Sequence, residues 1–564
     1  MRDAGKQLQG SFISIGIVSL FINALMLSGP VYMLQVYDRV LSSQSEQTLV
    51  ALTILVFGLY AVMAALESIR SGMMARVAGV FESTLTKSVF HANARLAMYN
   101  ADSAERPDPV RDLDQCRSFL ASAGPLAMFD LPWLPVYLLI VFFIHPYLGL
   151  LATVGAIVLV VMMLVNNALS QEPVHQGASA ISSRSSMASA VRGNPGATLG
   201  MSMITNLAHR WEKTTAGLLS AQTRAADISG TFKAISKSSR LFLQSAVLGL
   251  GAYLALQDQI SAGMMLAASI IAARALAPVE QMIGSWRSLV AARQAKIRLS
   301  AALELTAVKP VTTRLPLPRQ SLSVDGLVSG PNRATPVLRG VSFTLHAGDG
   351  LGVIGSSGSG KTTLSRALLG IWPVLAGSLR LDGASLDQWS PEALGRAVGF
   401  LPQEVGLFDG TIAENIARFT PDPNATDVIN AARLAGVHEL ITALPDGYAT
   451  KIGEGQLQLS AGQRQRLGLA RALYGDPFLV ILDEPNANLD ADGDACLSRA
   501  ITRVRERGAI VIIIAHRPSA IASVDQLLVI RDGRQMEFGP KQSVLESMTK
   551  NSSQIQTAAG LKVA

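Results

Sequence analysis

The chain has few charged residues and almost no cysteine, and each scarcity excludes a class of protein. Charged residues make up 16% of the 564 residues, against about a quarter in soluble proteins. The two cysteines, Cys116 and Cys496, lie far apart and suit neither a disulfide framework nor a metal site. No basic run is interleaved with aromatic residues, so the net charge of +7 does not indicate nucleic-acid binding. With a mean hydropathy of +0.33, the composition favours a membrane protein.

The apolar residues are concentrated in the first half of the chain, in stretches of roughly the length that crosses a bilayer. About 20 helical residues are needed for one crossing. The connections after the second and fourth stretches are long and amphipathic, so we expect them to extend the spans as helices beyond the membrane. The six predicted spans cover residues 12–37, 49–66, 126–144, 148–165, 241–256 and 260–277.

The distribution of positive charge predicts the orientation of these spans. The two long connections are rich in Arg and Lys, beginning with Arg70, whereas the three short connections contain only Arg39. By the positive-inside rule, the long connections, the N-terminus and the C-terminal half are cytoplasmic. The apolar stretch that follows the first residues has no small-residue cleavage site, so a cleavable signal peptide is not expected.

Charged residues in or beside the spans need a reason, because charge in hydrocarbon is costly. Arg274 lies in the sixth span, where it lines a hydrophilic path for cargo, snorkels to the cytoplasmic face or pairs with Glu280. Asp130 lies near the start of the third span, and for this residue we favour a helix cap over a transport role. Pro278 predicts a kink in the sixth span.

The second half of the chain contains a phosphate-binding loop pattern, GSSGSGKT, at residues 355–362. An apolar run at 351–354 predicts a strand before it, and residues 363–369 predict a helix after it. The glycines let the backbone curl so that its N–H groups face phosphate oxygens. Lys361 is then placed to reach the β- and γ-phosphates of ATP, and the Thr362 hydroxyl to hold Mg²⁺.

Polar residues follow three more predicted strands, each an apolar run. The run 478–482 ends in Asp483 and Glu484, which suit a carboxylate that organises Mg²⁺ and a base for the attacking water. Another run leads to His516, and Gln403 follows a third. Because open α/β sheets bind ligands at the carboxyl ends of their strands, we expect these residues to converge on one site.

These motifs resemble those of ATP-binding-cassette (ABC) ATPases. LSAGQ, residues 459–463, is similar to the LSGGQ signature peptide of that family, and residues 488–490 are similar to its D-loop. Gln403 resembles the Q-loop glutamine and His516 the switch histidine. Ala461 departs from the signature, and Gly330 stands where many relatives place an aromatic residue against adenine.

The resemblance implies a homodimer with two ATP sites, because two cassettes of this family pack head to tail. Ser460 and Gly462 of one copy would contact the γ-phosphate held by Lys361 of the other. The implied catalytic residues are Glu484, His516, Gln403 and Lys361, and the implied Mg²⁺ ligands are Thr362, Gln403 and Asp483. The implied ATP-binding residues are Gly355, Ser356, Ser357, Gly358, Ser359, Gly360, Lys361, Thr362, Thr363, Gln403, Ser460, Gly462, Gln463, Asp490 and His516.

Phrases in the membrane half resemble the permease/ATPase of bacterial type I secretion systems, in the branch that exports proteases, lipases and calcium-binding repeat proteins. This resemblance implies ATP-driven export of an unfolded polypeptide with a C-terminal signal, from the inner membrane. The implied partners are a membrane-fusion adaptor and an outer-membrane channel, and the peptidase-like N-terminal domain of bacteriocin exporters is not expected. The phrases are residues 32–40, 130–133, 145–146, 277–281 and 286–287.

Two other functions stay open: an exporter of lipids or small hydrophobic molecules, and a nucleotide-gated membrane regulator or channel. In either case the predicted fold is a six-span helical membrane bundle joined to an α/β P-loop ATPase domain of ABC type. A proline-bearing segment, residues 306–319, predicts the linker between them. The transmembrane domain is then 1–305, the nucleotide-binding domain 320–550 and a loosely ordered tail 551–564. The family resemblance also implies coupling helices near residues 98–104 and 199–210.

Overall fold

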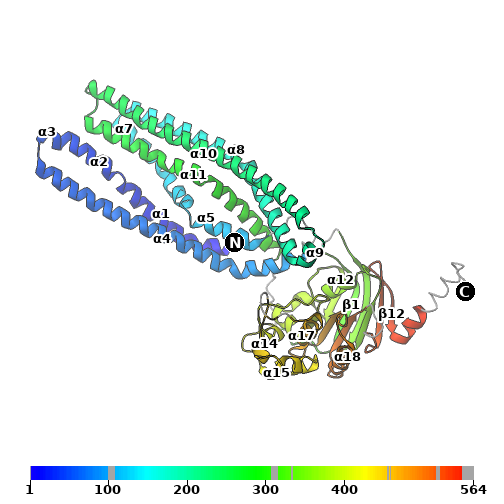
Figure 1. Cartoon of the computed structure of the whole chain (residues 1–564). Coiled ribbons are helices and arrows are strands. Elements are labelled where there is room, and N and C mark those ends of the chain that lie inside the picture. Colours follow the sequence, from blue (N-terminus) through cyan, green and yellow to red (C-terminus); the bar gives the residue numbers. More distant parts are fainter. Residues whose placement is uncertain are drawn as a thin grey trace. The chain divides into compact units, whose positions relative to one another are not determined.

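The computed structural model describes residues 2–99, 108–306, 315–331, 335–453, 457, 459–515 and 521–548. The chain forms two compact units, residues 1–307 and 308–564 (Figure 1). The described part of the first unit is helical, and the second unit combines strands with helices. Most of the predicted linker, 306–319, and all of the predicted tail, 551–564, lie outside the described residues. The linker boundary and the loose ordering of the tail therefore stay predictions.

The first unit contains six helical segments that are long and apolar enough to cross a membrane, which confirms the predicted number of spans. Three of its helices have 54, 48 and 53 residues, so the two long connections do extend the spans as helices. The helices are α1 (Arg2–Leu25), α2 (Ser28–Gln35), α3 (Leu41–Ser43), α4 (Glu46–Tyr99), α5 (Pro109–Leu120), α6 (Ala123–Asp130), α7 (Leu134–Ile144), α8 (Pro146–Gly193), α9 (Pro195–Gly200), α10 (Ile204–Leu256) and α11 (Ala262–Leu305).

The first span and one connection differ in detail from the prediction. The first span is interrupted between α1 and α2, where Pro30 stands in the first turn of α2 and cannot donate a backbone hydrogen bond to the preceding helix. The short helix α9 begins at Pro195, earlier than the coupling helix implied at 199–210, because Pro favours the first turn of a helix. The other implied coupling helix, 98–104, lies mostly outside the described residues.

A buried ion pair joins α4 to α6 inside the membrane unit. Arg70 donates from Nη1 to Asp130 Oδ1 at 2.7 Å and to the Ser19 hydroxyl at 3.2 Å. Asn23 donates to the same carboxylate oxygen at 2.8 Å, and the Tyr137 hydroxyl donates to the Asn23 carbonyl at 2.8 Å. The prediction that Asp130 caps a helix is wrong, because its side chain forms no cap hydrogen bond. A buried carboxylate is instead stabilised by a cation and hydrogen bonds.

We expect Arg70→Met to destabilise the first unit by about 3–5 kcal/mol, because it leaves the Asp130 charge buried without its partner. The measurement is thermal unfolding of the purified protein in detergent. The matched control is the double variant Arg70→Met/Asp130→Asn, which leaves neither charge behind and should recover most of the lost stability. Equal melting of wild type and Arg70→Met would contradict a stabilising role for the pair.

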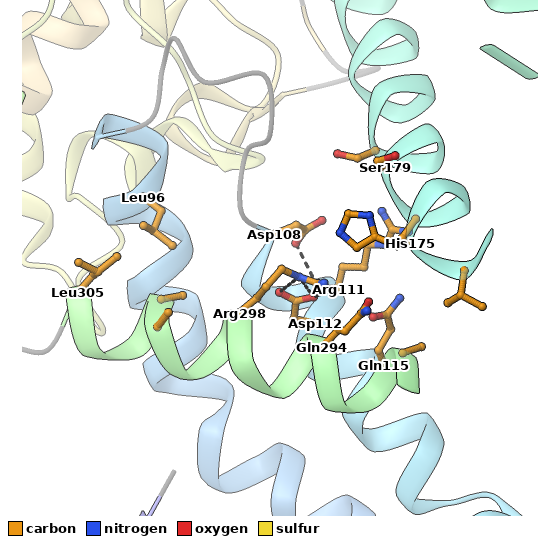
Figure 2. A pocket seen from close by; sticks show the side chains of 16 residues that line it. Leu96, Asp108, Arg111, Asp112, Gln115, His175, Ser179, Gln294, Arg298 and Leu305 are labelled. Atoms are coloured by element: carbon orange, nitrogen blue, oxygen red, sulfur yellow. Dashed lines mark hydrogen bonds and ion pairs between the residues drawn. The ribbon is translucent and has the colours of Figure 1, made fainter. Parts of the chain in front are cut away.

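A second ion pair joins α5 to α11 outside the spanning segments. Arg298 donates through Nε to the two Asp112 carboxylate oxygens at 3.1 and 3.2 Å. Figure 2 shows this pair beside His175 of α8, on the wall of a cavity of about 370 Å³. Burial raises the pKa of Asp112, and the hydrogen bond from Arg298 opposes that rise. The pair therefore holds α5 against α11 beside this cavity.

Glu280 of α11 pairs with Arg240 of α10, with Nε and Oε2 2.6 Å apart. The proposed pairing of Arg274 with Glu280 is therefore wrong. Within the described ranges, Arg274 makes neither a hydrogen bond nor an ion pair with another residue, and it is exposed. The helix α11 continues on both sides of Pro278.

The second unit is built on a six-stranded sheet of order β12-β11-β3-β10-β9-β6. Its strands β3, β10, β9 and β6 are parallel neighbours, and each lies on a predicted apolar run. The bounds of β3 and β9 match the runs 351–354 and 478–482 within one residue. Both faces of these strands are buried, which explains the unbroken apolar runs. The strands are β3 (Gly350–Ile354), β6 (Val398–Leu401), β9 (Leu479–Asp483), β10 (Ile510–Ile514), β11 (Gln526–Arg531) and β12 (Arg534–Pro540).

A smaller antiparallel sheet of order β2-β1-β4-β5 lies in the same unit, which also has a two-stranded sheet of β7 (Gly410–Thr411) and β8 (Lys451–Ile452). One apolar core lies between this sheet, α12 and one face of the large sheet, and a second core lies on the other face under α17 and α18. The bounds are β1 (Ser321–Ser329), β2 (Leu338–His346), β4 (Val374–Leu381), β5 (Ala384–Ser385), α12 (Lys361–Leu368), α17 (Ala461–Leu473) and α18 (Ala491–Glu506).

Candidate active site

Parallel pairing brings the predicted site residues to one edge of the large sheet. Asp483 ends β9 and lies opposite Ile514 of β10, while Gly355 directly follows the neighbouring strand β3. Gln403 follows β6 on the other side of β9. His516, which comes two residues after β10, lies outside the described residues. The expectation that these strand ends converge is thus confirmed for the described members.

The loop between β3 and α12 has the curled backbone that its glycines predicted. Gly358 and Gly360 adopt positive φ angles of 77° and 104°, which L side chains rarely adopt. A Cβ at Gly355 would lie 2.2 Å from the Ile530 carbonyl oxygen, so that position also requires glycine. The helix α12 begins at Lys361, two residues earlier than predicted, and presents the free N–H groups of its first turn to the loop.

The inside of this loop fits a phosphate group. Lys361 is buried, and its ammonium group donates to the carbonyls of Gly355 and Ser356 at 2.9 and 2.8 Å. The hydroxyl of Ser359 is buried and, within the part of the chain that the structure describes, has no hydrogen-bond partner. An unsatisfied hydroxyl, free helical N–H groups and a buried cation together form an anion site. Burial lowers the pKa of Lys361, opposed by Glu484 and Asp483.

Two carboxylates face this loop from the end of β9. Burial raises the pKa of Asp483 to about 6, and the neighbouring Glu484 charge adds to the rise while Lys361 opposes it. Glu484 has a positive φ of 49°, and its N–H donates to the Ile514 carbonyl at 2.8 Å. Gln403 donates from Nε2 to Glu484 Oε2 at 3.0 Å. Oxygen ligands of this kind are the ones that Mg²⁺ prefers, so the donor set fits a divalent cation.

The LSAGQ residues start the helix α17. The Ser460 hydroxyl accepts a hydrogen bond from the Gln463 N–H at 3.2 Å, and the Gln463 side chain accepts one from the Ser460 N–H at 2.9 Å. This capping box leaves the helix N-terminus ordered and exposed. In the described residues, no hydrogen bond or ion pair joins Ser460, Gly462 or Gln463 to the phosphate-binding loop. Asp490 caps α18 through the Gly493 N–H at 2.8 Å.

Two residues of α17 that are absent from the predicted site contact residues 484–490, which follow β9. Gln465 is buried, and its amide donates to the carbonyls of Pro485 at 3.2 Å and Glu484 at 3.4 Å. Arg466 lies 3.8 Å from the Asp490 carboxylate. Helical spacing places Gln465 on the same face as the buried Leu469, and a polar residue on an apolar face was the available signal.

The structure explains why an aromatic residue is missing before β2. A Cβ at Gly330 would lie 2.4 Å from the Thr335 carbonyl oxygen. The Val337 N–H donates to the Ser329 carbonyl at 2.9 Å, which fixes this close approach. No aromatic side chain fits position 330 on this backbone, so adenine must be held by other groups.

A phosphate-binding ATPase sheet in a chain with six membrane-spanning helices defines an ABC transporter. The ABC transporter family matches residues 338–487, and the ABC transporter transmembrane region matches residues 12–276. The chain belongs to this family. It is an ATP-hydrolysing transporter of the membrane.

Relatives within the family are similar over almost the whole chain. The type I secretion system ATP-binding protein PrsD of Rhizobium meliloti is 46% identical, over 99% of this chain and 96% of its own length. The cyclolysin secretion/processing ATP-binding protein CyaB of Bordetella pertussis is 29% identical, over 96% of this chain and 76% of its own length. These matches confirm the resemblance to type I secretion proteins.

The fold is also that of a solved exporter. The structure of a bacterial Atm1-family ABC exporter with ATP bound has a TM-score of 0.81, with 99% of both chains covered and 21% identity. At this identity the match concerns the fold alone. It confirms the predicted combination of a helical membrane bundle and an ABC-type ATPase domain.

Proposed function

We propose that this chain is the inner-membrane ATPase of a type I secretion system, which exports an unfolded polypeptide with a C-terminal signal. The observation that carries the proposal is the 46% identity to a type I secretion protein along 99% of the chain. Because the identity extends through the membrane half, it concerns the transport path as well as the ATPase. A lipid exporter would need to share only the ATPase motifs.

In this proposal, the phosphate-binding loop holds the triphosphate of ATP. Lys361 exchanges its two loop carbonyls for β- and γ-phosphate oxygens, and Ser359 gains the hydrogen-bond partner that it lacks. Residues 355–363 supply the surrounding N–H and hydroxyl groups. Thr362, Gln403 and Asp483 would hold Mg²⁺, which neutralises charge on the β- and γ-phosphates when bound.

Glu484 is proposed to orient and deprotonate the water that attacks the γ-phosphate. Its carboxylate is held by the 3.0 Å hydrogen bond from Gln403, and its backbone by Gln465 and Ile514. These contacts fix the position of the base beside the phosphate-binding loop. His516, outside the described residues, is proposed to position the same water.

Two copies of the chain are proposed to form two ATP sites, each completed by residues of the other copy. Ser460, Gly462 and Gln463 are ordered at an exposed helix N-terminus, and the described residues hold no link from them to the loop of their own chain. A helix N-terminus attracts anions, so it suits the γ-phosphate held by a second copy. Closure of the two cassettes would then act on the membrane helices through their cytoplasmic ends.

The proposed topology and partners follow from the same assignment. In this proposal the N-terminus and the ATPase unit lie in the cytoplasm, which the Arg- and Lys-rich long connections support. A membrane-fusion adaptor and an outer-membrane channel would carry the polypeptide onward. No nucleic-acid partner is proposed.

Capture of a stalled cargo tests the export function. We expect Glu484→Gln, expressed in cells with a photocrosslinking amino acid at position 281, to capture a polypeptide that mass spectrometry identifies by its C-terminal peptides. The control is Lys361→Ala with the same crosslinker, which should capture much less because the cassettes cannot close. Capture of lipid alone would favour a lipid exporter, and ion conduction in liposomes a nucleotide-gated channel.

A further inference from the structure

Positively charged side chains line a cavity between α10 and α11. Lys233 and Arg240 come from α10 and Arg274 comes from α11, whereas Glu280 is the one carboxylate on the described wall. The cavity measures about 630 Å³, which is within the usual range of ligand sites. The described wall of this cavity therefore has three positive charges and one negative charge.

Only one of the three cations is neutralised. Arg240 lies 2.6 Å from Glu280, and both side chains are mostly buried, with 22% and 20% of their surface exposed. Lys233 and Arg274 are exposed side chains, and neither forms an ion pair within the ranges that the structure describes. The cavity therefore has two uncompensated positive charges.

The depth of Arg274 requires an anionic or aqueous surrounding. A rise of 1.5 Å per residue places it about 18 Å from the start of α11, where a short turn connects α11 to α10. With that turn at one membrane boundary, Arg274 lies inside the sixth predicted span, 260–277, three residues before its end. A charge in hydrocarbon is costly, so the side chain must reach water or an anion, and the cavity offers room for either.

The wall suits a peptide better than a lipid phosphate. Gln281 and Glu280 offer oxygen acceptors beside the cations, and a peptide brings both carboxylates and N–H donors, whereas a phosphate brings only acceptors. Gly284 on the same wall borders open space, since a Cβ built there would have no heavy atom within 4 Å.

We propose that this cavity receives an acidic segment of the exported polypeptide, with Lys233 and Arg274 pairing with its Asp and Glu side chains. The inference rests on the proposed export function and adds the chemical class of the cargo segment. Arg240 and Glu280 position each other and keep the two helices together. The uncompensated charges give the cavity a preference for anionic over neutral sequences.

Binding of synthetic peptides to the full-length protein in nanodiscs of neutral lipid tests the proposal. The probes are dye-labelled peptides of ten Asp-Gly repeats, ten Asn-Gly repeats and ten Lys-Gly repeats, followed by fluorescence anisotropy. We expect the Asp peptide to bind at least tenfold more tightly than the Asn peptide, and the Lys peptide to bind least. The difference should shrink as salt is raised, because salt screens the charges.

Variants assign the effect to this cavity. Lys233→Gln/Arg274→Gln should remove the preference for Asp over Asn peptides, and Lys233→Glu/Arg274→Glu should shift it toward the Lys peptide. Lys213→Gln/Arg224→Gln, at exposed positions of α10 outside the cavity lining, should leave it intact. An unchanged melting temperature and a single size-exclusion peak in all three variants verify folding.

Two results would overturn the inference. One is equal binding of Asp and Asn peptides to the wild type, and the other is a preference that survives in Lys233→Gln/Arg274→Gln. A preference that is abolished by adding phosphatidylglycerol to the nanodiscs, while photoactivatable phosphatidylglycerol labels α11, would assign the cavity to lipid headgroups and also refute it. If the Asp and Asn peptides bind equally but Glu484→Gln still captures a polypeptide, the export function stands and only this cargo site is refuted.

Discussion

Glu484→Gln is expected to lower the steady-state ATPase rate by roughly a hundredfold to ten-thousandfold while ATP stays bound. The amide keeps the size of the side chain and can still accept the hydrogen bond that Gln403 donates at 3.0 Å. What it loses is the capacity to take a proton from the attacking water. Binding depends mainly on the phosphate-binding loop, so affinity for ATP should change little. The measurements are phosphate release and retention of radiolabelled ATP after washing.

A matched control distinguishes loss of the base from a general effect of removing a carboxylate. Glu439 is exposed and lies in the same unit, in the short helix α16 (His438–Thr442). Glu439→Gln should retain the wild-type rate and release its nucleotide. Normal turnover in Glu484→Gln would refute the role assigned to Glu484.

Ser460→Asp is expected to abolish ATP-driven pairing of the cassettes, whereas Ser460→Asn should retain much of it. Asp and Asn are similar in size and cap helices as well as Ser, so both should preserve the start of α17. Only Asp places a negative charge next to the γ-phosphate of the other copy. At an effective dielectric constant near 20, two unit charges 4 Å apart repel by about 4 kcal/mol, or roughly a thousandfold in affinity. Dimer formation is measured by sedimentation with and without ATP, in a Glu484→Gln background.

Mixing two inactive variants tests whether each ATP site is shared between copies. In a heterodimer of Lys361→Ala with Ser460→Asp, one site has both defects and the other has none. We therefore expect the mixture, in the Glu484→Gln background, to retain nucleotide that neither variant retains alone. A chain that keeps Lys361 and Ser460, paired with the double variant Lys361→Ala/Ser460→Asp, gives a heterodimer with one defect in each site. This mixture should not retain nucleotide. No recovery in the first mixture would indicate sites contained within one chain.

Patterns along the chain predicted the elements of the ATPase unit well, because their causes are local. The strands β3, β6, β9 and β10 are apolar runs buried on both faces, and the loop before Lys361 needs glycine wherever φ is positive or the backbone is close. The same holds for the six spans, whose length is set by the bilayer. These properties can be read from the sequence without knowing which distant residues contact one another.

Pairings between distant residues could not be predicted in this way. Arg70 and Asp130 are 60 positions apart, and only the packing of α4 against its neighbours brings them together. Without that knowledge, an aspartate near a helix start favoured a cap. The choice of Arg240 rather than Arg274 as the partner of Glu280 likewise depends on how α10 faces α11. Gln465 was missed because its partners are backbone carbonyls, which leave no mark in the sequence.

The hydrogen bonds of Gln465 have a consequence for timing between the two halves of the proposed dimer. This side chain ties the helix that begins at Ser460 to the main chain of Glu484 and Pro485 in the same copy. A shift of the segment around Glu484 after phosphate departs would thereby move the start of that helix, which in the proposed dimer contacts ATP bound to the other copy. Hydrolysis in one copy would thereby alter the ATP contacts of the other through the Gln465 amide. The two copies would then hydrolyse ATP in alternation rather than independently.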